Sequence, residues 1–275
     1  MGNIIYGRVL ADSIIQERDG TAYTFAGNDQ LVLKQMCDEI NETFPDYPYK
    51  FHYLSEISMI NLPVGASTIL LKYIYQFESE SCRSVLFPSI IVDKMEKDVK
   101  KNLDRIIMDL YHHFRESPYY IAPPESGRSA HIYLGYDNAL KRVVSPKIFP
   151  ELVDLMKFPR DAYILSLTLR KIVRKWAPKE LGKIMAAHLM NKNVTRADVG
   201  LPEEGKYYPS LETIVDQVAF NAIDCLQFYP SEENLRIILD YTNTPYKALA
   251  EFAQKHAKLM EANLLKRKTA DGSMS

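Results

Sequence analysis

Glycine is scarce in this chain, which has 11 glycines among 275 residues, or 4%, against an average of about 7% in globular proteins. No G-x-G-x-x-G and no G-x-x-x-x-G-K-[ST] pattern occurs. Glycine-rich loops of these two kinds cradle phosphates in widespread nucleotide-binding designs. The sequence therefore argues against nucleotide binding by either design.

Cysteine is scarce as well, and the three cysteines, Cys37, Cys82 and Cys225, lie far apart. An odd number without C-x-x-C spacing fits neither a disulfide framework nor a zinc site, so we expect a reducing compartment. The N-terminus has no basic segment followed by a long apolar run, and no apolar stretch is long enough to cross a bilayer. We therefore expect a cytoplasmic protein without a membrane span.

Neither sign of charge is in excess, because 34 Lys and Arg stand against 35 Asp and Glu. With 47% hydrophobic residues, the composition is typical of a globular protein rather than of a disordered or membrane chain. A chain of this length suits either one large domain or two smaller ones.

Residues 1–145 mix strand and helix patterns and predict an α+β domain, in which a small mixed or antiparallel sheet packs with two helices. The clearest strand is 68–77, where β-branched and aromatic residues alternate with a mixed face. The expected strands are 3–10, 21–25, 49–55, 68–77, 84–91 and 131–136, and the expected helices are 29–43 and 93–116.

From residue 146 onward every periodic segment is helical, and prolines stand near the first helical positions, where a missing N–H is harmless. This pattern predicts an all-helical domain over 146–268, built as a bundle or as HEAT-like helical hairpins, and a flexible tail at 269–275. The expected helices are 150–157, 160–176, 179–191, 210–227, 232–242 and 245–268.

Helix 93–116 carries a polar face opposite its apolar stripe. Asp109, His112, His113 and Glu116 fall within an arc of about 100°, and such side chains could hold a metal ion or perform acid–base chemistry. The element order also resembles the restriction-endonuclease-like core, although the third strand has no E-x-K, and it resembles longin-like adaptor domains equally well. A solvated helix face explains the same residues. A metal-dependent hydrolase or nuclease is therefore the alternative hypothesis, and we assign no catalytic residue, metal ligand or cofactor.

A basic surface is the stronger candidate site. Residues 146–192 hold ten Lys and Arg against four Asp and Glu. Four basic residues share the face of helix 160–176 that lies opposite its apolar face: Arg170, Lys171, Arg174 and Lys175. This face could bind phosphates or an acidic protein surface, although a run of charge is also typical of a merely solvated helix face.

Tyrosine is abundant, with 18 residues against 11 Phe and one Trp. Two tyrosine pairs, Tyr119/Tyr120 and Tyr207/Tyr208, lie in predicted loops that contain proline. Amphipathic rings in such loops are typical of partner contacts. The alternative is that the same rings attach long loops to the body of the protein.

The leading hypothesis is a non-enzymatic, cytoplasmic interaction or regulatory protein that binds a macromolecular partner through the basic helical face and the tyrosine-rich loops. A protein partner ranks before nucleic acid, because the positive charge is local in a chain whose net charge is −1.

Overall fold

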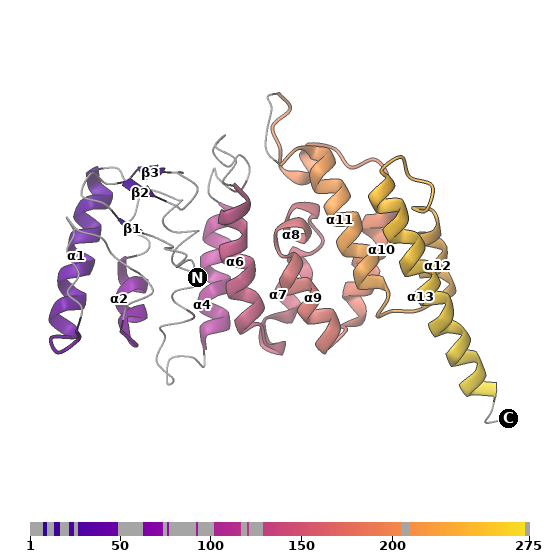
Figure 1. Ribbon diagram of the computed structural model, residues 1–275, viewed down its shortest axis with the longest axis horizontal. Helices are drawn as coiled ribbons and strands as arrows, with labels where there is room; N and C mark the ends of the chain where they lie inside the picture. The colour runs from indigo at the N-terminus through magenta and orange to yellow at the C-terminus, as the bar shows by residue number, and fades with distance from the viewer. Residues whose placement is uncertain are drawn as a thin grey trace. The chain divides into compact units, whose positions relative to one another are not determined.

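The computed structural model divides the chain into two compact units (Figure 1). Unit 1 comprises residues 1–120 and 128–143, and unit 2 comprises residues 121–127 and 144–275. The residues that the structure describes are 8–9, 14–16, 22–24, 27–48, 63–73, 76, 92, 102–116, 120, 129–204 and 209–272.

The described residues are mostly helical, so the prediction of an α+β fold with a sheet domain is wrong. Strand structure within the described part of the chain is confined to three antiparallel segments of two or three residues each. These are β1 (Arg8–Val9), β2 (Ile14–Gln16) and β3 (Ala22–Thr24). The expected strands 49–55 and 84–91 lie outside the described residues.

The segment expected as strand 68–77 forms helix α2 (Ala66–Tyr73), which packs against helix α1 (Gly27–Thr43). The Tyr73 hydroxyl donates a hydrogen bond to the Glu39 carboxylate on α1, at 2.7 Å. The large apolar residues that α2 buries recur at helical spacing and are Ile69, Leu70 and Tyr73. The apolar residues of segment 68–77 fit both the period of a strand and the period of a helix, and packing against α1 selects the helix.

The segment expected as strand 131–136 is likewise helical and belongs to α6 (Ser129–Val143), which packs against α4 (Leu103–Arg115). The rings of Tyr136 and Phe114 stack across this pair with centroids 4.9 Å apart. Ring stacking adds to the stabilisation that burial itself gives. Tyr136, the last residue of the expected strand, therefore takes part in a helix–helix contact.

Unit 2 consists of helices joined by turns and one longer loop. The predicted helix 160–176 is interrupted at Leu165, where φ is −94° and ψ is 35°. The described helices of unit 2 are η5 (Pro146–Ile148), α7 (Phe149–Leu155), α8 (Pro159–Ile164), α9 (Ser166–Lys175), α10 (Lys179–Met190), η6 (Ala197–Val199), α11 (Leu211–Leu226), α12 (Glu232–Leu239) and α13 (Lys247–Gly272). None of the described helices is long and apolar enough to cross a membrane.

Helices α8 to α13 stack as successive pairs. Each helix packs against the next within the pairs α8/α9, α10/α11 and α12/α13, while α11 also lies against both α9 and α13, and α10 lies against α12 (Figure 1). The second helix of each pair thus contacts the second helix of the next pair. Polar N-caps fix two of the helix starts, because Ser210 and Ser231 accept hydrogen bonds from the backbone N–H groups of Thr213 and Asn234.

Gly182 marks the place where α10 comes closest to the segment that precedes α12. A Cβ atom at Gly182 would lie 2.8 Å from two ring atoms of Tyr229. The Tyr229 hydroxyl donates a hydrogen bond to the Pro178 carbonyl at 2.8 Å, so the ring is anchored at the start of α10. Only glycine leaves room for this ring.

We therefore expect Gly182→Ala to destabilise the protein. In an unhindered helix this change stabilises by about 1 kcal/mol, whereas overpacking costs about 1–3 kcal/mol. Urea unfolding of the full chain should show a lower free energy of unfolding. The matched control repeats the change in a Tyr229→Leu background, where we expect it to be neutral or stabilising. A stabilising effect with Tyr229 present would contradict the contact.

Candidate functional site

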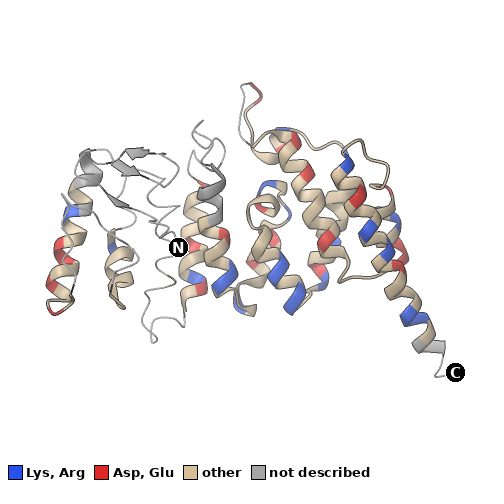
Figure 2. Ribbon diagram, in the orientation of Figure 1, with Lys and Arg blue, Asp and Glu red and all other residues tan. Residues whose placement is uncertain are grey.

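The predicted basic face lies on α9 (Figure 2), but its four basic residues differ in their exposure and in their contacts. Arg170 faces α11, where its Nε atom lies 3.3 Å from Oδ2 of Asp224. Lys171 is half-buried, whereas Arg174 and Lys175 at the end of α9 are exposed. Arg170 therefore contributes to helix packing, and the surface open to a partner begins at Arg174.

Asp224 is the centre of a contact that joins three helices. Its side chain is 14% exposed, and its Oδ1 atom lies 3.6 Å from Nε2 of His256 on α13. Nδ1 of His256 lies 2.9 Å from the Phe252 carbonyl oxygen, so both ring nitrogens of His256 face acceptor atoms. The contact with His256, followed by the charge of Arg170, holds the pKa of Asp224 below its usual range, against the opposing effect of burial.

Four exposed cations run from the end of α9 into α10, and we call them the cationic surface: Arg174, Lys175, Lys179 and Lys183. None of them has a salt-bridge partner within the part of the chain that the structure describes. The Nζ atom of Lys175 lies 4.6 Å from the centroid of the Trp176 ring. This cation–π contact orients Lys175 without neutralising it.

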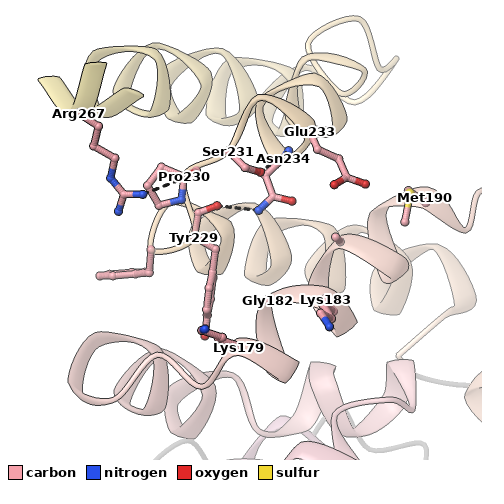
Figure 3. A pocket seen from close by; sticks show the side chains of 12 residues that line it. Lys179, Gly182, Lys183, Met190, Tyr229, Pro230, Ser231, Glu233, Asn234 and Arg267 are labelled. Carbon is pink, nitrogen blue, oxygen red and sulfur yellow. Dashed lines mark hydrogen bonds between the residues drawn. The ribbon is translucent and has the colours of Figure 1, made fainter. Parts of the chain in front are cut away.

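A groove of about 680 Å³ lies between α10 and the start of α12. From α10 it is lined by Lys179, Gly182, Lys183, Ala186 and Met190. From the other side it is lined by Phe228, Tyr229, Pro230, Ser231, Glu233, Asn234 and Arg267 (Figure 3). The floor is apolar and aromatic, while two lysines and one arginine stand on the rim.

Polar groups on the α12 side of the groove are largely satisfied within the protein. The Asn234 amide donates to the Tyr229 carbonyl at 2.7 Å, and Ser231 Oγ caps α12 (Figure 3). One guanidinium nitrogen of Arg267 donates to the Pro230 carbonyl at 3.4 Å, which leaves further N–H donors of that group available. The groups left to recognise a ligand are therefore mainly cations.

A second hollow, of about 580 Å³, lies beside α10 and includes Phe158, Ile184 and His188. Nε2 of His188 donates a hydrogen bond to the Met156 carbonyl at 2.7 Å. Burial lowers the pKa of His188, so the ring is neutral near pH 7. This histidine connects α10 to the residues that follow α7, which is a structural role.

The predicted tyrosine sites are only partly described. Tyr120 is buried, its ring lies edge-on to Phe114 at 5.8 Å, and the Arg115 guanidinium is 5.7 Å from its centroid. Tyr119, Tyr207 and Tyr208 lie outside the described residues. The placement of Tyr120 fits a ring that attaches its segment to the body of unit 1.

The polar face of α4 is largely open to solvent. Asp109, His113 and Glu116 are exposed and His112 is half-buried. Asp109 forms an ion pair with Arg105 at 2.7 Å. Within the described ranges, no group of three or more His, Cys, Asp or Glu side chains is placed to hold a metal ion.

Most residues that line the groove are not marked by any pattern in the sequence. Lys179 and Lys183 extend the positive charge of residues 146–192 from α9 onto α10. No sequence pattern around Arg267 or Met190 predicts that they line a groove. A usable signal was present in Phe228-Tyr229-Pro230-Ser231, where an aromatic pair and a proline precede an N-cap residue. Such a pair lies at a helix start and can line the space beside it.

No protein-family model matches the chain, and neither the curated proteins nor the solved structures contain a match. Function is therefore inferred from this chain's own residues.

Asp224→Asn should destabilise the protein in a pH-dependent way. The folded-state pKa of Asp224 is lower than its unfolded-state pKa of about 3.9. The ionised carboxylate therefore contributes fully to folding stability above the unfolded-state pKa, and this contribution is lost as pH falls through the folded-state pKa. We expect the free energy of unfolding to fall by about 1–3 kcal/mol at pH 7. This range already allows for the solvent exposure of Arg170, which weakens its ion pair with Asp224. The difference from the unmodified protein should shrink as pH falls below about 5.

Urea unfolding between pH 7 and the lowest pH at which both proteins fold measures this difference. Asp154→Asn is the matched control, because Asp154 pairs with Lys157 at 2.6 Å and is 70% exposed. An exposed pair contributes at most about 1 kcal/mol. Equal losses in the two variants would contradict the structural role of Asp224.

Proposed function

We propose that the chain is a non-enzymatic binding protein that holds an acidic region of a protein partner on the cationic surface of unit 2. The observation that carries this proposal is the set of exposed, unneutralised cations beside a groove with an apolar floor. Surfaces of one charge sign raise the rate at which oppositely charged partners meet, and apolar floors supply burial.

A protein partner fits this surface better than nucleic acid. Glu180 on α10 and Glu233 on the groove rim are both exposed and interrupt the positive charge. A nucleic acid presents closely spaced phosphates and favours a continuous basic stripe. An acidic protein segment can place its carboxylates at intervals and avoid both glutamates.

The alternative of a metal-dependent hydrolase or nuclease gains no support from the described residues, where the polar face of α4 is solvent-exposed and Asp109 is paired with Arg105. We also propose a cytoplasmic location. Cys37 and Cys225 are free and buried, and burial raises the pKa of Cys37 to about 12 and raises that of Cys225 as well. Such thiols are inert core residues and suit a reducing compartment.

Reversing two charges of the cationic surface should abolish most binding to an acidic ligand. Lys175→Glu with Lys179→Glu avoids Arg170 and Arg174, whose charges both help to hold the pKa of Asp224 below its usual range. We expect the affinity for a fluorescent glutamate-rich peptide to fall about ten-fold or more at low salt, and the difference to narrow near 1 M salt, where the Debye length is about 3 Å. Fluorescence anisotropy measures both effects.

Lys255→Glu with Lys258→Glu is the matched control, because both lysines are exposed on α13 and the net charge changes equally. We expect this control to retain most of the affinity. Equal weakening by both pairs, or no binding of the peptide, would contradict the proposal. A DNA duplex that bound more tightly than the peptide, and lost affinity in the Lys175/Lys179 variant alone, would assign the surface to nucleic acid instead.

A further inference from the structure

The groove between α10 and α12 differs from the rest of the cationic surface because it combines charge with an apolar floor. The Tyr229 ring packs directly on Gly182, and Ala186 adds only a methyl group on the same side of α10. The space over Gly182 is filled by this ring, so the room for a ligand side chain lies beside the ring, next to Ala186 and Met190. The floor is fixed in place, because Tyr229 is hydrogen-bonded to Pro178.

We infer that this groove binds a short, extended segment of an acidic partner protein and takes one apolar side chain of that segment onto its floor. The inference rests on the proposed function and deepens it, because it names what the partner must carry besides negative charge. A segment with carboxylates alone would use only the rim. A segment with an apolar residue among its carboxylates would use both rim and floor.

The length of the groove sets how many residues of an extended segment it can hold. Met190 lies eleven positions after Lys179 on α10, a span of about 16 Å at 1.5 Å per residue. Extended chain rises about 3.3 Å per residue, so about five residues cover this length.

The charges on the rim also set the orientation of the ligand. Figure 3 draws Arg267 and Lys179 on the side away from Met190, and Glu233 on the same side as Met190. Carboxylates of the segment should therefore lie toward Arg267 and Lys179, where no acidic side chain lines the groove. The apolar residue should lie toward Met190, whose side chain is 57% exposed and can close over it.

The test compares two peptides of about eight residues that carry the same glutamates. One has a leucine in the middle of the glutamates, and the other has a serine at that position. We expect the unmodified protein to bind the leucine peptide about ten-fold more tightly, because burial of a leucine side chain is worth about 1.4 kcal/mol or more. Anisotropy at constant salt measures both affinities.

Two variants localise this preference. Met190→Ser removes the apolar end of the groove without changing charge, and Ala186→Leu extends a side chain into its floor. Each should reduce the ten-fold preference at least several-fold while affinity for the serine peptide is retained. Leu259→Ser on α13, where Leu259 is 45% exposed, is the matched control and should keep the full preference.

Methyl NMR of methionine-labelled protein gives a direct readout. The Met190 resonance, assigned by its loss in Met190→Ser, should shift on addition of the leucine peptide, whereas that of the fully buried Met185 on the same helix should not. If both peptides bind equally and Met190 does not respond, the groove inference is overturned while the proposed function stands. If neither peptide binds, both are overturned.

Discussion

The carboxylate of Asp224 is the constraint on which the stacked helices of unit 2 depend. It lies between Arg170 of α9 and His256 of α13, so one side chain of each second helix in the stack takes part. A carboxylate with so little exposure is costly unless cations and N–H donors surround it. The amide of Gln227 completes its surroundings at 2.7 Å. The spacing of α9, α11 and α13 is therefore tied to one charged group.

This constraint also determines which cations remain for a partner. Arg170 is directed toward Asp224, and the charge of Arg174, one turn later on the same face of α9, acts on Asp224 as well, so the cations with no part in this contact are Lys175 and those on α10. The groove depends on a separate fit, in which Gly182 accommodates the Tyr229 ring at van der Waals limits. Charge placement and groove shape thus arise from different contacts, and a mutation in one should leave the other largely intact.

The sequence predicted the helices of unit 2 well, because their apolar residues recur with a single period and prolines or serines mark their starts. It failed at 68–77 and 131–136, where aromatic and β-branched residues satisfy both strand and helix periods. Only the packing of α2 on α1 and of α6 on α4 decides between them. The ion pair of Arg170 could not be predicted for a similar reason, since Asp224 lies 54 positions away and no local pattern reveals an ion pair of that kind.

The same reasoning explains why the local charge of residues 146–192 overstates the surface available for binding. Arg160 is buried, Lys157 pairs with Asp154, and Arg170 faces Asp224. A few exposed cations cannot by themselves hold a partner for long, because salt screens them and water competes. They govern mainly how fast a partner arrives, whereas burial in a shaped groove governs how slowly it leaves. In the binding that we propose, specificity therefore comes from the apolar groove rather than from the lysines around it.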